Sequence, residues 1–201
     1  MDSIPHSHCD FTGWHTVSGG SGVCGMRLIA FSGYMGSGKS FAADYLIEKY
    51  GYTRVKFAGP LKDMLRTMGL KENEIEGEDK DKPSDLLCGR TPRWAMQSLG
   101  TEWGRECIGE NLWGNLWESQ VTKLLKNRRP VVADDCRFDN EAARVKRLGG
   151  LVCLLTSKTS GKDVTHPSEA LPNNPDITME NNHGHELYQM IDALVGRKIS
   201  V

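Results

Sequence analysis

The sequence predicts an α/β fold of three layers (α/β/α), in which a mainly parallel sheet is covered by helices on both faces. Two observations lead to this prediction. Short apolar runs with the length of buried strands alternate with segments of helical periodicity, an order typical of a parallel sheet. The first such run, residues 26–31, leads directly into the glycine-rich stretch "GYMGSGKS" and then into a helix. We therefore expect one domain built around a strand, a loop and a helix near its start.

The glycine-rich stretch matches the pattern G-x-x-x-x-G-K-S/T from Gly33 to Ser40. Its glycines allow successive backbone N–H groups to surround phosphate oxygens, and the start of the next helix adds partial positive charge. Lys39 is placed to reach the β- and γ-phosphates, and the Ser40 hydroxyl to coordinate Mg²⁺. The pattern predicts a P-loop NTPase fold, with the nucleotide contacted by Gly33, Tyr34, Met35, Gly36, Ser37, Gly38, Lys39, Ser40 and Phe41.

The next elements follow in chain order. The first helix, residues 39–50, ends at Gly51, which suits the position after a helix. Residues 52–58 resemble a second strand, and Pro60 suits the start of a helix over 59–70. The charged run 71–82 has no apolar face, so we interpret it as a solvated loop.

Two more helices are expected before the third strand. Thr91 and Pro92 suit the cap and first turn of a helix that carries Met96, Leu99, Trp103 and Cys107 near one face. Asn111 suits the cap of another, with inward side chains at Leu112, Leu116 and Leu124. Together with the preceding segment, these form a helical insert over about residues 59–128.

The C-terminal part continues the alternation. Residues 130–135 form a compact apolar strand, and a helix passes through Ala142, Val145 and Leu148. A strand over 151–156, a polar loop over 157–175, a brief strand over 177–179 and a last helix over about 185–195 complete the chain.

Residues 1–25 differ from the rest, because Gly, Ser and His dominate and "SGGSG" has the composition of a flexible linker. One interpretation is a zinc site formed by His6, His8, Cys9 and His15, and the other, which we favour, is a disordered leader. The folded domain is then residues 26–201.

Composition excludes several classes of protein. The net charge of −1 gives no global basic field, so we expect no nucleic-acid partner. No apolar run approaches the ~20 residues of a membrane-spanning helix. The six cysteines form no C-x-x-C pair, which indicates a reduced, cytoplasmic protein. Small molecules are the expected partners.

Among P-loop proteins, three observations favour a small kinase. The chain is too short for motor or transporter modules beside the core, and the base-reading motif N-K-x-D of G proteins is absent from the sequence. The insert stands between the second strand and the strand that ends in aspartates. In that place it can hold a phosphate acceptor over the γ-phosphate.

The insert carries groups that suit a nucleotide. Arginine binds phosphate bidentately, and the candidates are Arg90, Arg93 and Arg105. Gln97 can read the edge of a base. Trp113 and Trp117 lie one helical turn apart, so one can stack on a base while the other packs; a core position for each remains open.

The segment "ADDCRFDNE" (133–141) is the second chemical centre. Its carboxylates follow an apolar strand and lie at the edge where open α/β folds bind ligands. Asp135 can hold the water shell of Mg²⁺ or accept a proton from the acceptor, and Arg137 can neutralise the transferred phosphoryl group. The catalytic candidates are therefore Lys39, Asp135 and Arg137.

The segments "FSGYMGSGKSFAADYL", "VKFAGPLKDML", "TPRWAMQSLGTEWGRE", "VVADDCRFDNEA" and "HPSE…ITMENNHGHELYQMID" together resemble the bacteriophage-type deoxynucleoside monophosphate kinases. The resemblance implies an NMP-kinase-like fold, ATP with Mg²⁺ as donor, a deoxynucleoside monophosphate (dNMP) as acceptor, and the host cytoplasm if the protein is phage-encoded. A homodimer remains open. It also implies that the acceptor is surrounded by Arg93, Gln97, Trp113, Trp117, Asp135, Arg137 and Glu141.

One position departs from this family. Trp94 stands where some members carry a basic residue, which leaves fewer charges for the acceptor phosphate. Animal phosphomevalonate kinases are also similar, in the P-loop, in "GPLK" and in a D-x-R pattern after the third strand, but they lack the TPR…LGTE stretch. A phosphomevalonate-type or other small-molecule kinase, and a nucleotide-binding module without activity, stay as alternatives.

Overall fold

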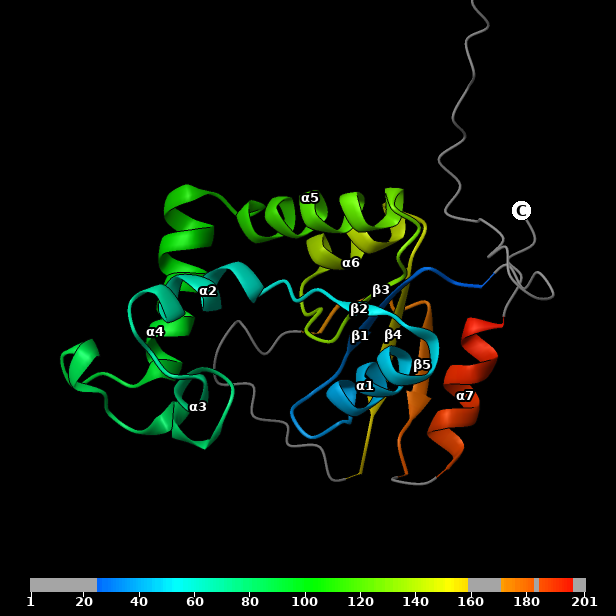
Figure 1. The fold of residues 1–201 in the computed structure, drawn as a ribbon, viewed down its shortest axis with the longest axis horizontal. Coiled ribbons are helices and arrows are strands. Elements are labelled where there is room, and N and C mark those ends of the chain that lie inside the picture. Colours follow the sequence, from blue (N-terminus) through cyan, green and yellow to red (C-terminus); the bar gives the residue numbers. More distant parts are fainter. Residues whose placement is uncertain (1–24, 159–170, 183–184, 197–201) are drawn as a thin grey trace, which may run out of the picture.

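The computed structural model describes residues 25–158, 171–182 and 185–196. Within them a parallel five-stranded sheet runs in the order β2-β3-β1-β4-β5 (Figure 1). The strands are β1 (Leu28–Ser32), β2 (Thr53–Arg54), β3 (Val131–Ala133), β4 (Leu151–Thr156) and β5 (Ile177–Glu180). The predicted α/β fold with a parallel sheet is confirmed. The expectations for residues 1–24, the alternative zinc site included, lie outside the described residues.

Helices cover both faces of the sheet (Figure 1). On one face lie α1 (Lys39–Tyr50) and α7 (Glu186–Val195), which contact each other. On the other lie α5 (Leu112–Lys126) and α6 (Asp139–Arg147), also in mutual contact. In the part of the chain described, no helix is both long and apolar enough to cross a lipid bilayer.

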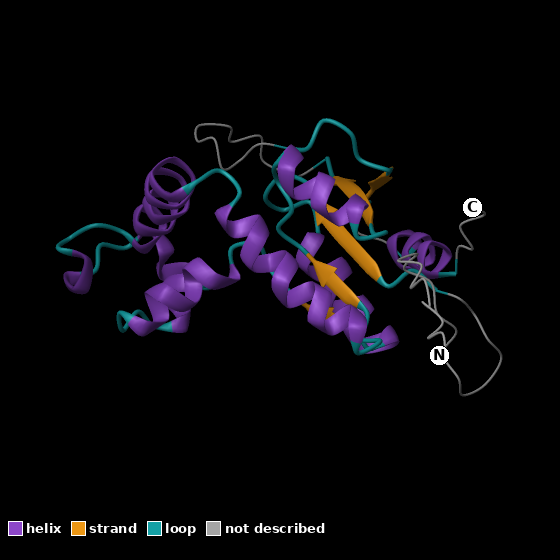
Figure 2. Cartoon of the chain, turned by 90° about the horizontal axis from the view of Figure 1, so that it is seen from above, coloured by secondary structure: helices purple, strands orange, loops and turns teal. Residues whose placement is uncertain are grey.

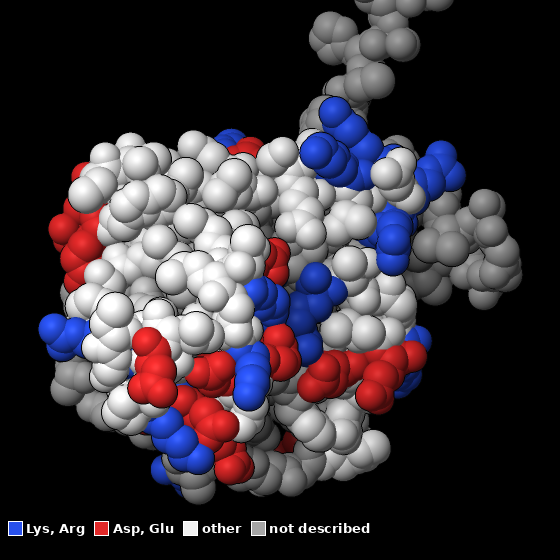
Figure 3. Space-filling view, turned by 60° about the vertical axis from the view of Figure 1, so that its left-hand side comes forward, with Lys and Arg blue, Asp and Glu red and all other residues white. Residues whose placement is uncertain are grey.

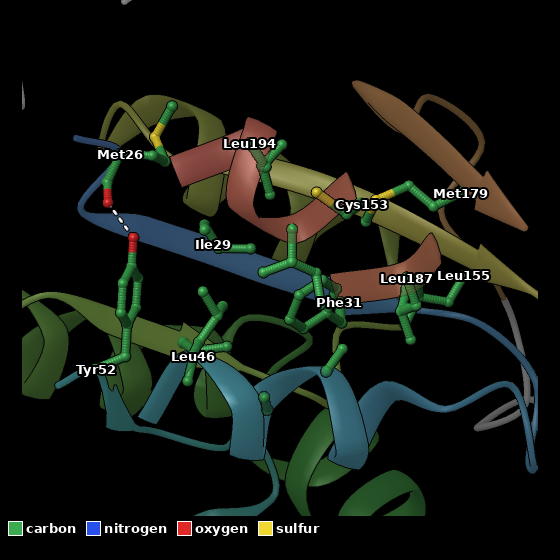
Figure 4. Packing of buried hydrophobic residues seen from close by; sticks show 14 residues of the cluster. Met26, Ile29, Phe31, Leu46, Tyr52, Cys153, Leu155, Met179, Leu187 and Leu194 are labelled. Atoms are coloured by element: carbon green, nitrogen blue, oxygen red, sulfur yellow. Dashed lines mark hydrogen bonds between the residues drawn. The ribbon is translucent and has the colours of Figure 1, made fainter. Parts of the chain in front are cut away.

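The central strand β1 joins the two layers because its side chains alternate between them. Ile29 and Phe31 pack with Leu46 of α1 and Leu187 of α7 in the cluster of Figure 4. Just before β1 begins, the Met26 carbonyl oxygen accepts a hydrogen bond from the Tyr52 hydroxyl (Figure 4). Burial on both sides explains why residues 28–31 are apolar without alternation.

The second cluster lies between β1 and the opposite helices. Leu28 and Ala30 of β1 pack with Trp117 and Val121 of α5 and with Val145 of α6. All five side chains are buried, with exposed fractions of at most 2%. The core therefore has two apolar layers, which hold β1 and the loop that follows it in place.

The insert between β2 and β3 is helical, as expected. Most of it stands beside the strands rather than over them (Figure 2). In order it contains α2 (Gly59–Thr67), α3 (Glu72–Ile75), the 3₁₀ helices η1 (Glu78–Asp81) and η2 (Asp85–Leu87), α4 (Pro92–Ser98) and the π-helix η3 (Leu99–Ile108). The last insert helix, α5, returns to the sheet and belongs to the core.

Two local predictions are wrong. The run 71–82 is not a loop, because it forms α3 and η1 and buries Ile75 completely beside Leu65 and Leu70. One apolar side chain is enough to anchor this charged segment. The expected inward position of Leu116 on α5 is also wrong, because this side chain is 43% exposed, whereas Trp117 and Val121 face the sheet.

We expect Ile75→Ala to lower the free energy of unfolding by about 2–4 kcal/mol, because it removes a fully buried side chain and leaves a cavity. Denaturant unfolding measures this change. Ile108 is the matched control: it is 57% exposed at the end of η3, so Ile108→Ala should change stability by at most about 0.5 kcal/mol. Equal effects of the two substitutions would show that residues 71–82 do not pack as described.

Candidate active site

The loop after β1 has the backbone shape that phosphate binding requires. Gly33, Gly36 and Gly38 all adopt positive φ angles, of 143°, 80° and 94°. A Cβ at Gly33 would lie 2.3 Å from the Leu155 carbonyl oxygen, so no larger residue fits there. The helix α1 begins directly after Gly38, at Lys39. Its first N–H groups and the loop amides can therefore surround an anion.

Lys39 lies over this loop. Its Nζ donates hydrogen bonds to the carbonyl oxygens of Gly33 and Tyr34, at 2.7 and 2.8 Å. Met35 and Phe41, also expected to contact the nucleotide, are exposed at the rim, with 64% and 50% of their surface accessible. The predicted nucleotide-binding residues thus form one continuous segment, the loop after β1 and the first turn of α1.

Asn181, a residue that no local sequence pattern selects, supports the loop through a side-chain hydrogen bond. The residue follows β5, and its backbone N–H donates to the Thr156 carbonyl oxygen at 2.7 Å. Its buried side chain donates from Nδ2 to the Ser37 carbonyl oxygen at 3.1 Å. A Cβ at Gly38 would lie 2.2 Å from the same Nδ2, which explains the glycine.

Asp134, the residue directly after β3, is a second group that the sequence analysis did not select. Its side chain is buried, and within the described residues neither carboxylate oxygen makes a hydrogen bond. One of these oxygens lies 3.3 Å from Nε of Arg54. The same guanidinium donates to the Ser40 carbonyl oxygen at 3.2 Å, so Arg54 connects Asp134 to the start of α1. Buried carboxylate oxygens without donors suit a hydrated cation.

Asp135 has a different environment. Its two carboxylate oxygens accept hydrogen bonds from the backbone N–H groups of Phe57 and Ala58, both at 2.9 Å. Burial raises the pKa of this carboxyl, while the two N–H groups oppose that shift. From the sequence, Asp135 can hold the water shell of Mg²⁺ or accept a proton from the acceptor. In the structure its carboxylate connects the end of β3 with the start of α2.

A cavity of about 230 Å³ opens between the insert and the end of β3. Seven of the residues expected around the acceptor line it: Arg93, Gln97, Arg105, Trp113, Asp135, Arg137 and Glu141. The structure thus brings together residues from four helices, α4, η3, α5 and α6, and from the loop after β3.

The cavity lining carries more positive than negative side chains. Its cations are Lys62, Lys80, Arg93, Arg105 and Arg137, and its carboxylates are Asp135 and Glu141. Figure 3, which brings the insert side of Figure 1 forward, shows basic and acidic side chains mixed in a band below a wide uncharged area. Burial lowers the pKa of Lys80, with neighbouring cations adding to the effect. An excess of cations suits an anionic ligand.

Two lining cations are bound to carboxylates outside the cavity. Arg93 makes a bidentate contact with Asp81, at 2.6 and 3.0 Å. Lys62 donates to Glu76 at 2.8 Å. Both acidic partners belong to the charged segment that the sequence analysis interpreted as a loop, so this segment helps to arrange the cavity.

The two tryptophans of α5 differ in position. Trp113 lines the cavity, although only 3% of it is exposed, and its Nε1 donates to the Gly100 carbonyl oxygen at 2.8 Å. Trp117 is fully buried, donates to the Val55 carbonyl oxygen at 2.9 Å and stacks on Phe57 at a ring distance of 4.2 Å. Trp117 therefore does not line the cavity, as the resemblance implied, but takes the core position left open for each tryptophan, packed against residues that follow β2.

Arg90 and Trp94 lie away from the cavity. The Arg90 guanidinium is 4.8 Å from the centre of the Trp94 ring, which is 49% exposed. Neither residue belongs to the cavity lining. The departure from the family at Trp94 therefore removes no charge from this cavity wall.

Glu141 and Arg105 form the best-buried ion pair of the cavity. Nη2 of Arg105 donates to Oε1 of Glu141 at 2.7 Å, and the side chains are 14% and 4% exposed. Oε2 of Glu141 accepts the backbone N–H groups of Arg137 at 2.9 Å and Phe138 at 3.2 Å. The guanidinium carbon of Arg105 lies 3.7 Å from the centre of the Phe138 ring. The pair thus fixes one wall of the cavity.

Comparison with curated proteins gives one full-length relative. The chain is 35% identical to the "Putative deoxynucleotide monophosphate kinase" of Acanthamoeba polyphaga mimivirus, over 85% of this chain and 96% of the relative. It is 31% identical to "Uncharacterized protein ORF76" of Ictalurid herpesvirus 1 (strain Auburn), over 62% of this chain and less than half, 46%, of that protein. No family model matches the chain.

Solved kinase structures share a general likeness. An APS kinase from Mycobacterium tuberculosis has a TM-score of 0.42 and 13% identity, over 85% of this chain and 97% of its own. A protein described as a "putative kinase" from Chloroflexus aurantiacus has a TM-score of 0.49 and 10% identity, over 84% and 93%. At these values we draw no conclusion from either.

The pH dependence of stability tests the environment of Glu141. Burial raises its pKa from 4.5 to about 7, although the Arg137 N–H and the Arg105 charge oppose this shift. The protonated form therefore contributes stability that is complete below about pH 4.5 and is lost as the pH rises through about 7. Relative to wild type, Glu141→Gln should gain about 2–3 kcal/mol of unfolding free energy between about pH 5 and about pH 8.

Urea unfolding at several pH values measures this difference. Glu118→Gln is the control, because Glu118 also binds arginines, Arg144 and Arg147, both at 2.6 Å. Although burial opposes it, these hydrogen bonds hold the pKa of Glu118 below its usual value, so its substitution should bring no such gain. A pH-independent difference between Glu141→Gln and wild type would contradict the described environment.

Proposed function

The chain belongs to the family of the mimivirus deoxynucleotide monophosphate kinase, and from this premise we propose that it transfers the γ-phosphate of ATP to a dNMP, giving a dNDP and ADP. One observation carries the proposal. The cationic cavity begins where β3 ends, and β3 is paired with β1, the strand that leads into the phosphate loop. Donor and acceptor sites of a phosphotransferase would then share one edge of the sheet.

The donor site would be the loop from Gly33 to Ser40. Its amides and the first turn of α1 would hold the phosphates of ATP, and Asn181 supports the loop from behind. Lys39, which now bonds two loop carbonyl oxygens, would exchange them for phosphate oxygens. Its ammonium would stabilise charge that develops between the β- and γ-phosphates as the bond breaks.

The residues present fit a magnesium ion. Asp134 offers buried carboxylate oxygens without hydrogen-bond donors among the described residues, and Arg54 joins it to the backbone of Ser40. The Ser40 hydroxyl and the Asp134 carboxylate would hold Mg²⁺, the latter through water. When bound, the ion would neutralise charge on the β- and γ-phosphate oxygens.

The acceptor site would be the cavity. Arg105 and Arg137 would bind the phosphate of the dNMP, since a guanidinium can form two parallel hydrogen bonds to it. Arg93 can join them by leaving Asp81, and an exposed ion pair of this kind is worth at most about 1 kcal/mol. Gln97 would contact the base edge, and the apolar walls would cover its faces.

The reaction itself tests the proposal. We expect ADP release from ATP only when a dNMP is present, measured in a coupled assay with each common NMP and dNMP and with phosphomevalonate.

Lys39→Ala should lower kcat at least about 100-fold, because it removes a preorganised charge at the transferred phosphate. Lys49→Ala is the control, since Lys49 bonds Asp192 on the outer side of α1.

Each other result would point to a different function. ATP consumption without an acceptor would indicate a hydrolase, and none with any acceptor would indicate a binding module. Phosphomevalonate as the preferred acceptor would support the alternative small-molecule kinase.

Substitutions of the two aspartates after β3 should differ in their effect on the Mg²⁺ dependence of activity. We expect Asp134→Asn to raise the Mg²⁺ concentration for half-maximal activity roughly tenfold, because the residue would hold the water shell of the ion. Asp135→Asn should leave this concentration unchanged and lower the melting temperature, because one backbone N–H of Phe57 or Ala58 loses its carboxylate partner. The reverse pattern would indicate that Asp135, and not Asp134, holds the water shell of the ion.

A further inference from the structure

We propose that Glu141 is a positioning residue, which aims the Arg105 guanidinium into the cavity and holds the turn that presents Arg137. The inference rests on the proposed function, because the anion that these arginines would bind is the acceptor phosphate. It differs from the role that family resemblance implies for Glu141, direct contact with the acceptor.

The hydrogen bonds of Glu141 support this role. One oxygen accepts from Arg105 at 2.7 Å, and the other accepts from the N–H groups of Arg137 and Phe138 at 2.9 and 3.2 Å. Both oxygens are thus occupied by groups of the protein. A free carboxylate facing an anionic substrate would also repel it, whereas one bonded to an arginine is offset by the charge of that arginine.

Arg105 keeps donors for a ligand. Of its five N–H groups, one on Nη2 binds Glu141 and one on Nη1 donates to the Glu110 carbonyl oxygen at 3.3 Å. The Phe138 ring covers one face of the guanidinium, 3.7 Å from its carbon atom. These three contacts fix the plane of the group, and its other N–H groups remain for an anion. Orientation in advance reduces the entropy that binding costs.

Stability does not explain the charge of Glu141. Burial raises the pKa of this carboxyl to about 7, which means that its ionised form is held at a cost to folding. Buried ionisable groups of this kind gather at functional sites. By contrast, the pKa of Glu118, which binds two arginines between α5 and α6, is lowered. Glu118 thus behaves as a structural ion pair and Glu141 does not.

Glu141→Gln separates the hydrogen bond to Arg105 from the hydrogen bonds to the backbone N–H groups. The amide oxygen of glutamine can still accept from the N–H groups of Arg137 and Phe138, but its NH₂ group cannot accept from Arg105. We expect the acceptor KM to rise roughly tenfold, a loss of 1.4 kcal/mol of binding. The ATP KM should stay within twofold, and the melting temperature near pH 8 should be equal to or above that of wild type. A merely structural role predicts the opposite pairing, a lower melting temperature with an unchanged acceptor KM.

Glu118→Gln is the matched control, since it removes a carboxylate charge that two arginines bind outside the cavity. It should lower the melting temperature and leave both KM values unchanged. An acceptor KM of Glu141→Gln within twofold of wild type would overturn the positioning role.

A readout independent of the reaction separates this inference from the proposed function. Inorganic phosphate should raise the melting temperature of wild type more than that of Arg105→Ala, and the contribution of the phosphate loop cancels in this comparison. Glu141→Gln should respond like Arg105→Ala. If no nucleotide is accepted but this pattern holds, the proposed function fails and the positioning role stands. If Glu141→Gln responds like wild type, the positioning role fails whatever the acceptor.

Discussion

The site depends on one short connection, the carboxylate of Asp135 with the backbone N–H groups of Phe57 and Ala58. These two residues follow β2 and precede α2, so the contact fixes where the insert leaves the sheet. Without it, the chain between β2 and α2 would have two buried N–H groups to satisfy elsewhere. Because the insert forms most of the cavity walls, their position over the edge of the sheet follows from this buried carboxylate.

The parallel sheet gathers the remaining groups. Its strands end at one edge, so the phosphate loop after β1, Asp134 after β3 and Asn181 after β5 come together although the chain separates them widely. Asn181 reaches Ser37 across the neighbouring strand β4. A group selected by such a long-range contact leaves no local pattern in the sequence, which is why Asn181 could not be predicted.

Periodicity and turn residues were enough to predict the strands, most of the helices and the phosphate loop, whereas residue chemistry and the family resemblance supplied seven of the residues that line the cavity. Finer choices depended on packing. Asp134 and Asp135 are neighbours at the end of a strand, and only the tertiary structure shows which of them meets Arg54. Trp113 and Trp117 lie one turn apart, yet contact with the residues that follow β2 buries only the second completely. In residues 71–82, the many charged side chains led to the prediction of a solvated loop, although the single buried Ile75 anchors this segment.

The cavity must bind an anion and must also fold without one. Cations in such a small volume repel one another, so carboxylate partners lower the cost of holding them together. Glu141, Glu76 and Asp81 supply such partners for Arg105, Lys62 and Arg93. The Arg93–Asp81 pair is exposed, whereas the Arg105–Glu141 pair is buried. In the mechanism that we propose, the exposed pair opens to bind the ligand, and the buried pair holds the orientation of its arginine.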